Sequence, residues 1–315
     1  MSELERHVSS NTVPAPLKRN FYVRSGFRVS DNEIRLSVVT YSRNKETLYW
    51  LRDGLAVGRV ELVCQGNKCP SDYSRRCALV GYIGIIKSDK PEQLTNTIEI
   101  TNSFDNNTVS IDLIDRRKPQ QLVYGHKLGV CVQPMFLYYN YLELISFIEK
   151  WIVAGATKFY FLQESMTSNI LKVINYYKNN VAGISVQVID WPSLPKLTDY
   201  HDPNLYIYRL ERNLAIMECM YHARYQTKYV AQVHLNQFII SQNHETLLTY
   251  LESKSTSHSI ASFSFRSVNA ILTSKWNSVE DMAKVKFENH FKVKHTRSFE
   301  RPIYSKLIFR PDYVS

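Results

Sequence analysis

Three polar side chains with potential ligand atoms follow an apolar run near the middle of the second half of the chain. Residues 229–233 are apolar or β-branched but for one Gln, contain no Gly or Pro, and predict a buried strand of a parallel sheet. His234, Asn236 and Gln237 come next, at the end of the strand where open α/β sheets bind ligands. In extended backbone His234 and Asn236 point to the same side, so they could face one ion or one phosphate group. An ordinary polar strand-to-helix loop is the competing interpretation.

Strand and helix patterns alternate around this run. Apolar runs predict strands, and residues spaced by three and four predict helices. The predicted strands span residues 128–134, 158–162, 185–191 and 259–265, and the predicted helices span 141–153, 168–179, about 210–221 and about 245–252. This alternation predicts an α/β domain with a mainly parallel sheet, right-handed crossovers and helices on both faces.

The first half of the chain has a different pattern. Short strands, separated by turn residues, are predicted at residues 33–41, 55–64, 78–86, 95–101 and 108–114, with a turn at 105–107. We therefore expect three regions: a polar tail at 1–19, a small antiparallel β-rich domain at 20–120, and the α/β domain at 121–315. The β-rich region contains no recognisable catalytic constellation.

The net charge of the chain is +10, with eight Lys or Arg and two Glu between residues 284 and 310. This basic segment is either a phosphate-neutralising surface or a solvated face. No Gly-rich phosphate loop, hydrolase nucleophile elbow or nucleic-acid-binding motif is present, so we expect no nucleic-acid partner.

The membrane and redox signals are sparse. No run of about eighteen apolar residues predicts a transmembrane helix, and residues 1–20 do not resemble a signal peptide. Cys64, Cys69 and Cys77 lack a fourth ligand for zinc; they either hold one disulfide, as in an oxidising compartment, or are free buried thiols. One glycosylation sequon occurs at Asn106.

Several short motifs in the second half, in matching order, carry a resemblance to a known family. They include Cys131-Val-Gln-Pro-Met135, Gly155-Ala-Thr-Lys-Phe-Tyr160 and Lys306-Leu-Ile-Phe-Arg-Pro311. With these motifs, residues 129–315 resemble glycosyltransferase family 92, whose members are Golgi sugar transferases with a GT-A-type nucleotide-sugar fold. The region before residue 129 is also similar, less distinctively, to the region that precedes the catalytic domain in that family.

The resemblance implies transfer of a sugar, often galactose, from a UDP-sugar to a glycan acceptor, usually with inversion and with Mn²⁺ or Mg²⁺. It also implies a lumenal location on a Golgi or other secretory-pathway membrane, through an anchor that this sequence lacks. Family domains usually continue beyond the Arg-Pro segment, so the resemblance implies either a domain truncated at its C-terminus, as in a fragment or an incomplete gene model, or a degenerate copy.

The resemblance also suggests site residues. Gln133 and Pro134 are expected near the nucleotide base, and Lys306 and Arg310 are expected to neutralise the diphosphate. A catalytic base is not identified. The available carboxylates are Asp190, Glu164 and Glu218.

The metal site is where the sequence departs from the family. His234, Asn236 and Gln237 stand where the family has Asp, Asp and Glu, so three formal negative charges are missing. Carboxylates offset the dehydration of a hard cation, and their loss predicts weak or absent dependence on Mn²⁺. The alternative to an active transferase is a protein that binds a sugar nucleotide or a glycan without turnover.

Overall fold

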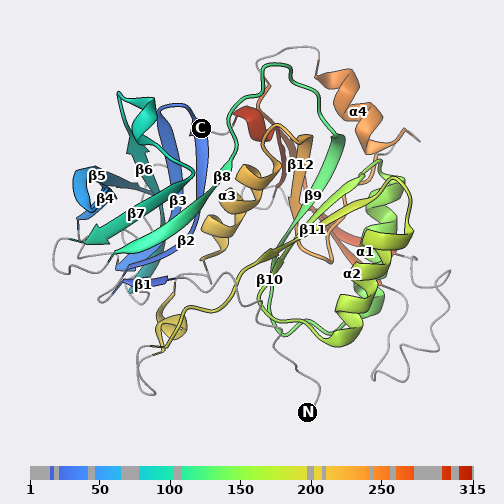
Figure 1. Cartoon of the computed structure of the whole chain (residues 1–315). Helices are drawn as coiled ribbons and strands as arrows, with labels where there is room; N and C mark the ends of the chain where they lie inside the picture. The colour runs from blue at the N-terminus through green and yellow to red at the C-terminus, as the bar shows by residue number, and fades with distance from the viewer. Residues whose placement is uncertain are drawn as a thin grey trace. The chain divides into compact units, whose positions relative to one another are not determined.

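The protein is a mixed α/β chain of two compact units. A computed structural model describes residues 15–17, 21–41, 47–64, 78–102, 108–196, 202–207, 211–241, 245–255, 260–272, 293–298 and 305–313. One unit, here the barrel unit, comprises residues 7–123 and 190–225; the other, the sheet unit, comprises mainly residues 124–189 and 226–315 (Figure 1). Residues 190–225 therefore pack with the first half of the chain, although they lie between two strands of the sheet unit.

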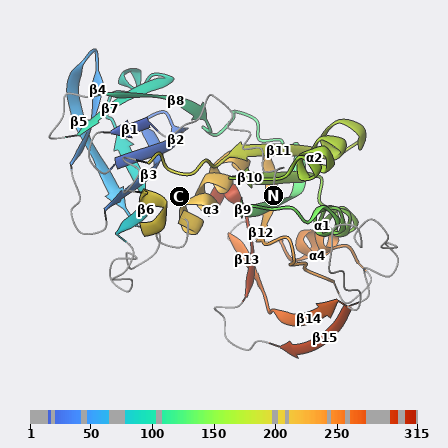
Figure 2. The ribbon, with the colours of Figure 1, turned by 90° about the horizontal axis from the view of Figure 1, so that it is seen from below.

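The barrel unit is built from eight strands. They are β1 (Ala15–Leu17), β2 (Phe21–Ser30), β3 (Glu33–Tyr41), β4 (Leu48–Arg52), β5 (Leu55–Val63), β6 (Leu79–Lys87), β7 (Thr97–Asn102) and β8 (Val109–Asp115). Their order is β1-β2-β3-β6-β5-β4-β7-β8, and β2 also pairs with β8 (Figure 2). That last pairing is parallel, and it closes β2 to β8 into a seven-stranded barrel-like sheet. The sequence patterns predict five of these strands within about two residues; the predicted turn at 105–107 lies outside the described residues.

A small residue in β2 faces the strand that closes the barrel. A Cβ atom on Gly26 would lie 2.5 Å from Cδ2 of Leu113 in β8. A larger residue would therefore displace the Leu113 side chain. The interior is filled by apolar side chains that alternate along the strands, including Ile34, Leu36 and Val38 of β3.

The outside of the barrel carries helix α3 (Arg212–Ala223). Phe21 and Val23 of β2 belong to the interior cluster, whereas Phe27 and Val29 pack against Tyr221 of α3. The register of β2 against β3 shifts between Val23 and Ser25. This β-bulge reverses the alternation and turns the second half of β2 toward the helix.

Buried polar side chains fix α3 to this strand. The guanidinium of Arg24 donates to both oxygens of Glu211, at 2.6 and 3.2 Å, and to the carbonyl of Pro192 at 2.7 Å. It also lies 4.4 Å from the ring centre of Trp191. Both members of the Arg24–Glu211 pair are buried, so separating them would leave an unpaired charge in the interior. Since Glu211 directly precedes α3, the pair fixes the start of the helix against β2.

A second anchor lies two turns further along α3. Glu218 accepts hydrogen bonds from Ser25 Oγ at 2.5 Å and from Ser37 Oγ at 2.6 Å, and His222 Nε2 lies 3.6 Å from its other oxygen. Burial alone raises the pKa of Glu218, but the nearby His222, with its charge, and the hydrogen bonds from Ser25 and Ser37 together lower it. These contacts explain why residues 190–225 pack with the barrel.

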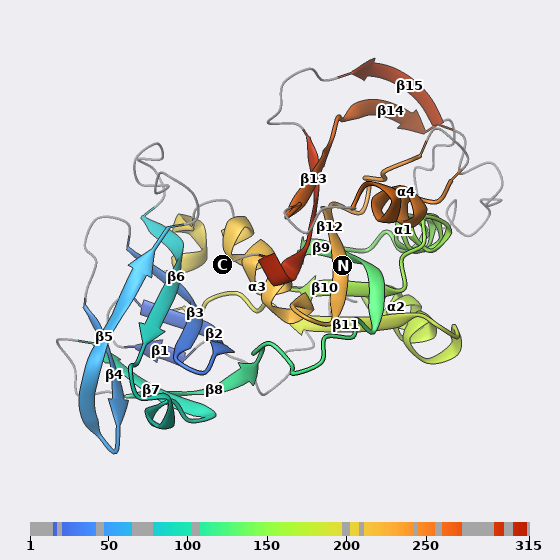
Figure 3. The same ribbon diagram turned by 90° about the horizontal axis from the view of Figure 1, so that it is seen from above.

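The sheet unit contains a six-stranded sheet and a separate two-stranded ribbon. The strands are β9 (His126–Met135), β10 (Lys158–Gln163), β11 (Ser185–Asp190), β12 (Thr227–Val233), β13 (Ser262–Phe265) and β16 (Lys306–Phe309), with β14 (Val268–Leu272) and β15 (Val293–Ser298) forming the ribbon. The order is β11-β10-β9-β12-β16-β13. β9 is parallel to both β10 and β12, whereas β16 is antiparallel to β12 and β13. The ribbon stands away from the six-stranded sheet, beyond β13 (Figures 2 and 3).

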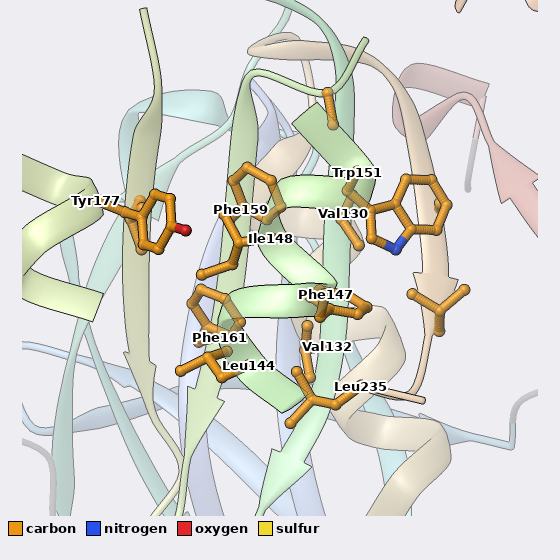
Figure 4. Packing of buried hydrophobic residues seen from close by; sticks show 14 of the residues in the cluster. Val130, Val132, Leu144, Phe147, Ile148, Trp151, Phe159, Phe161, Tyr177 and Leu235 are labelled. Atoms are coloured by element: carbon orange, nitrogen blue, oxygen red, sulfur yellow. The ribbon is translucent and has the colours of Figure 1, made fainter. Parts of the chain in front are cut away.

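Three helices cover one face of this sheet. They are α1 (Tyr141–Val153), α2 (Ser168–Asn180) and α4 (Leu247–Lys254), and all lie on the same side (Figure 3). Phe147 and Trp151 of α1 and Tyr177 of α2 pack in one cluster with Val130 and Phe159 of the strands (Figure 4). Gly155, with φ of +98°, ends α1 in the left-handed conformation that glycine favours.

Within the sheet unit, the described helices α1, α2 and α4 share a single core cluster. The expectation of helices on both faces of the sheet stays a prediction, since the strands also bury side chains outside that cluster, such as Cys131, Tyr160 and Val230. Helix α3 is bound to the barrel unit through Glu218. Among the described residues, no helix is long and apolar enough to cross a membrane.

Candidate active site

Three parallel strands end at the same edge of the six-stranded sheet. Val132 of β9 is in register with both Phe161 of β10 and Val233 of β12. The residues that follow these three positions therefore lie side by side at the carboxyl ends of the strands, where parallel sheets bind ligands. This edge, here the strand-end edge, brings together Gln133 and Pro134 of β9 with His234 after β12. Both Gln133 and His234 are partly exposed.

The chain turns sharply where β12 ends. The backbone N–H of Gln237 donates to the carbonyl of His234 at 3.0 Å, and the Gln237 side-chain oxygen accepts from the N–H of His234 at 3.0 Å. Leu235 is buried in the core, and Asn236 is exposed. The expectation of extended backbone, with His234 and Asn236 on the same side, is therefore wrong. The Gln237 side chain satisfies a backbone N–H that an extended strand would leave for a neighbouring strand.

The segment after the turn is held against α1. Trp151 Nε1 donates to the carbonyl of Gln237 at 3.3 Å. The ring of Phe238 lies 6.1 Å from that of Phe147 and 4.1 Å from Nζ of Lys150. Burial lowers the pKa of Lys150. The turn and the backbone after it are thus fixed by both hydrogen bonds and packing.

The two predicted phosphate-binding cations lie at opposite ends of β16. The register of Gln232 with Leu307 puts Lys306 next to the carboxyl end of β12. Arg310 follows the other end of β16. It is therefore near the amino end of β12, at the end of the sheet opposite the strand-end edge. The other basic residues between 284 and 304 lie outside the residues whose side chains the structure describes.

Arg310 is buried and engaged in a local network. Its Nη2 lies 3.7 Å from Asp312, and its guanidinium lies 4.0 Å from the ring centre of Tyr313. Tyr124 donates to Asp312 at 2.6 Å, and burial together with this carboxylate raises the pKa of Tyr124. Lys306 therefore lies at the strand-end edge, and Arg310 does not.

The loop after β9 contains exposed aromatic residues that the sequence analysis does not single out. Phe136, Leu137 and Tyr139 are 54%, 46% and 61% exposed. The sequence signal for this loop is an aromatic run placed between the end of a strand and Asn140, whose side chain caps α1 by accepting from the N–H of Glu143 at 3.1 Å.

The three carboxylates left as candidates for a base are in different environments. Glu218 is buried in the barrel unit and bound by two serines. Glu164 is partly buried and follows β10 at the strand-end edge, and Asp190 is exposed at the end of β11. The register of β10 with β9 places Glu164 at the strand-end edge, and Asp190 lies at the end of the neighbouring strand β11.

The residues at the end of β12 do not match the ligands that a hard divalent cation prefers. His234, Asn236 and Gln237 offer neutral donors, and the Gln237 oxygen already accepts a hydrogen bond from the N–H of His234. In the described part of the chain, no group of three or more His, Cys, Asp or Glu side chains is arranged to hold a metal ion.

Comparison with known families now gives the class of protein. Residues 126–315, about three fifths of the chain, match a family model of glycosyltransferases, and the match begins at the first residue of β9. The chain belongs to glycosyltransferase family 92. A comparison with curated proteins finds no match.

Proposed function

We propose that the protein transfers a sugar, with galactose as the first candidate, from a UDP-sugar to a glycan acceptor. The observation that carries the proposal is the family match, because it spans all the elements that form the strand-end edge. In this proposal residues 121–315 are a GT-A-like nucleotide-sugar domain. The sheet order supports it, since β11, β10, β9 and β12 follow the 3-2-1-4 arrangement of Rossmann-like sheets.

The donor would bind at the strand-end edge. Gln133 and Pro134 would lie near the nucleotide base, and His234 near the diphosphate. The only donors at the end of β12 are neutral, so a cation from the protein must offset the phosphate charge if Mn²⁺ does not. Lys306 is the described candidate, because its register places it beside the end of β12.

The cellular location in this proposal is the lumen of the Golgi or of another secretory compartment. Cys64, Cys131 and Cys219 are disulfide-bonded, which supports an oxidising environment. Cys69 and Cys77, the other cysteines of the expected disulfide region, lie outside the described residues.

A second candidate function is binding of a sugar nucleotide or glycan without turnover. The observation that favours it is the neutral turn after β12, in which the Gln237 side chain serves the backbone. The two candidates differ in whether UDP is released.

The test uses the purified full chain with UDP-galactose, UDP-glucose or UDP-N-acetylglucosamine, each with Mn²⁺ or with a chelator. Binding is measured by calorimetry, and turnover by release of UDP as the sugar passes to water or to an added neutral oligosaccharide acceptor. The transferase proposal predicts binding with release, and a loss of both on Gln133→Ala or Lys306→Ala. Tyr176→Ala, which changes an exposed residue of α2, is the control. Binding without release supports the second candidate. If none of the three donors binds, the transferase proposal is contradicted and only glycan binding is left of the second candidate.

A further inference from the structure

The loop between β9 and α1 presents aromatic side chains to solvent. Phe136 and Tyr139 are 54% and 61% exposed, three residues apart, directly beyond the strand-end edge. Large exposed aromatic side chains close together usually mark a binding surface rather than a structural need. The core of the sheet unit is complete without them, since neither belongs to its buried cluster or to the residues packed against it.

Several hydrogen bonds hold this loop in one conformation. The N–H of Leu137 donates to Ser165 Oγ at 2.7 Å, and the N–H of Tyr138 donates to the carbonyl of Ser165 at 3.2 Å. The hydroxyl of Tyr138 donates to Glu143 at 2.8 Å. Burial, followed by the charge of Glu143, raises the pKa of Tyr138, so the hydroxyl stays a donor. The loop after β9 is thereby tied both to the loop after β10 and to the start of α1.

The backbone of this loop is also strained. Leu137 has φ of +48°, in the left-handed region that a branched side chain rarely occupies. Such strain costs free energy and persists where neighbouring contacts impose it, often at binding sites. Here the hydrogen bond from the N–H of Leu137 to Ser165 Oγ holds the strained conformation. Leu137 lies between Phe136 and Tyr139 in the sequence.

The charge around the loop indicates the kind of ligand. No Lys or Arg occurs between Met135 and Glu149, or between Gln163 and Leu171 in the loop after β10 and the start of α2. Glu143 and Glu164 are the nearest carboxylates in sequence. A diphosphate would find no cation in these two loops, whereas a neutral ring with one apolar face could pack on an aromatic side chain.

We propose that Phe136 and Tyr139 form a stacking platform for a neutral hexopyranose ring of the acceptor glycan. This inference rests on the proposed function, because it takes the strand-end edge as the donor site and places the acceptor beside it. Ser165 is then a positioning residue that fixes the loop through Leu137. The rings contribute by burying apolar surface against the C–H face of the sugar.

The test is binding of the full chain to an array of neutral oligosaccharides ending in galactose, glucose, N-acetylglucosamine or fucose. Phe136→Ala and Tyr139→Ala should each weaken binding to the recognised glycans by roughly tenfold, as expected for one lost aromatic contact. Tyr139→Phe should retain binding, because it keeps the ring. Tyr176→Ala, at a residue 58% exposed on α2, is the matched control and should bind like the unmodified chain.

Calorimetry with UDP separates this inference from the proposed function. The platform proposal expects UDP affinity to be unchanged in Phe136→Ala and Tyr139→Ala, and Ser165→Ala to weaken glycan binding but not UDP binding. Equal loss of UDP affinity would assign the rings to the nucleotide and overturn the proposal. The proposal would also be overturned if the chain bound none of the neutral glycans, or if the variant with both Phe136→Ala and Tyr139→Ala bound them as tightly as the unmodified chain. A chain that binds glycans through these rings but never binds a UDP-sugar would contradict the proposed function alone.

Discussion

The side-chain oxygen of Gln237 accepts a hydrogen bond from the backbone N–H of His234 at 3.0 Å, while the N–H of Gln237 donates to the carbonyl of His234 at 3.0 Å. These two hydrogen bonds close the turn after β12. The geometry makes Gln237 a support for the turn, because its side-chain oxygen, the atom that would ligate a metal ion, already accepts a hydrogen bond.

This relationship predicts the effect of two substitutions. Gln237→Ala removes the acceptor for the His234 N–H and should reduce the free energy of unfolding by about 1 kcal/mol. Gln237→Glu keeps an oxygen in the same place and should retain stability. Urea denaturation measures both, with Asn236→Ala, at the exposed position of the same turn, as the control. Equal stability of the Ala and Glu variants would show that the hydrogen bond does not support the turn.

The sequence predicts where helices and strands begin and end more accurately than it predicts which elements pack together. Residues 141–153 are predicted as a helix and form α1 with the same bounds, because their apolar spacing and Gly155 are local signals. Strand β2 is not identified, because a bulge breaks its alternation between Val23 and Ser25. The helical spacing near residues 210–221 predicts α3 but not its neighbour, since Glu211 and Glu218 pair with residues more than 180 positions away.

In the candidate site, too, local features are predictable from the sequence and long-range placement is not. A polar patch at the end of a buried strand is visible in the sequence, and the structure puts Gln133 and His234 at one edge. Arg310 could not be excluded from sequence, because only the antiparallel direction of β16 puts it at the other end of β12. The turn at residues 234–237 depends on where one side-chain oxygen points, and spacing alone cannot reveal this.

The Arg24–Glu211 pair gives a prediction about stability. Arg24→Ala leaves the buried carboxylate of Glu211 without its partner and should cost about 3–5 kcal/mol of unfolding free energy. Removal of the exposed Arg117, which pairs with Asp115, should cost less than about 1 kcal/mol. Chemical denaturation compares the two variants. If Arg24→Ala prevents folding, Arg24→Lys should give a folded but less stable chain. A cost for Arg24→Ala as small as that for Arg117→Ala would refute the anchoring role.

The Glu218 carboxylate predicts a dependence of stability on pH. Its pKa in the folded chain is lowered from the ordinary value of 4.5. A lowered folded pKa contributes stability above pH 4.5, and this contribution is lost as the pH falls through the folded pKa. Unfolding free energies measured between pH 7 and pH 3 should therefore fall more steeply for the unmodified chain than for Glu218→Gln. Glu61→Gln, at an exposed position of β5, controls for the loss of one carboxylate. Parallel curves for the chain and Glu218→Gln would count against this account.

The disulfides predict a dependence on the redox state. Cys64, Cys131 and Cys219 are disulfide-bonded. Mass mapping of material secreted from eukaryotic cells should recover their peptides only in cross-linked form before reduction. Reduction should lower the unfolding temperature, because each bridge restricts the unfolded chain. Free thiols at Cys131 and Cys219 in secreted material would be the contrary result, and would remove this support for an oxidising compartment.

The last prediction concerns the metal dependence of donor binding. Neutral donors at the end of β12 do not offset the dehydration of Mn²⁺, so we expect UDP binding by the unmodified chain to depend weakly or not at all on the metal. The combined change His234→Asp, Asn236→Asp and Gln237→Glu introduces three carboxylates, and the Glu at position 237 can still accept from the N–H of residue 234. This variant should bind UDP more tightly with Mn²⁺ than with a chelator, in calorimetry on both forms. Its control is the same variant with Asn236 restored, in which the exposed carboxylate of the turn is missing and the gain from Mn²⁺ should shrink. Tight, Mn²⁺-dependent binding of UDP by the unmodified chain would show that neutral donors suffice at this turn.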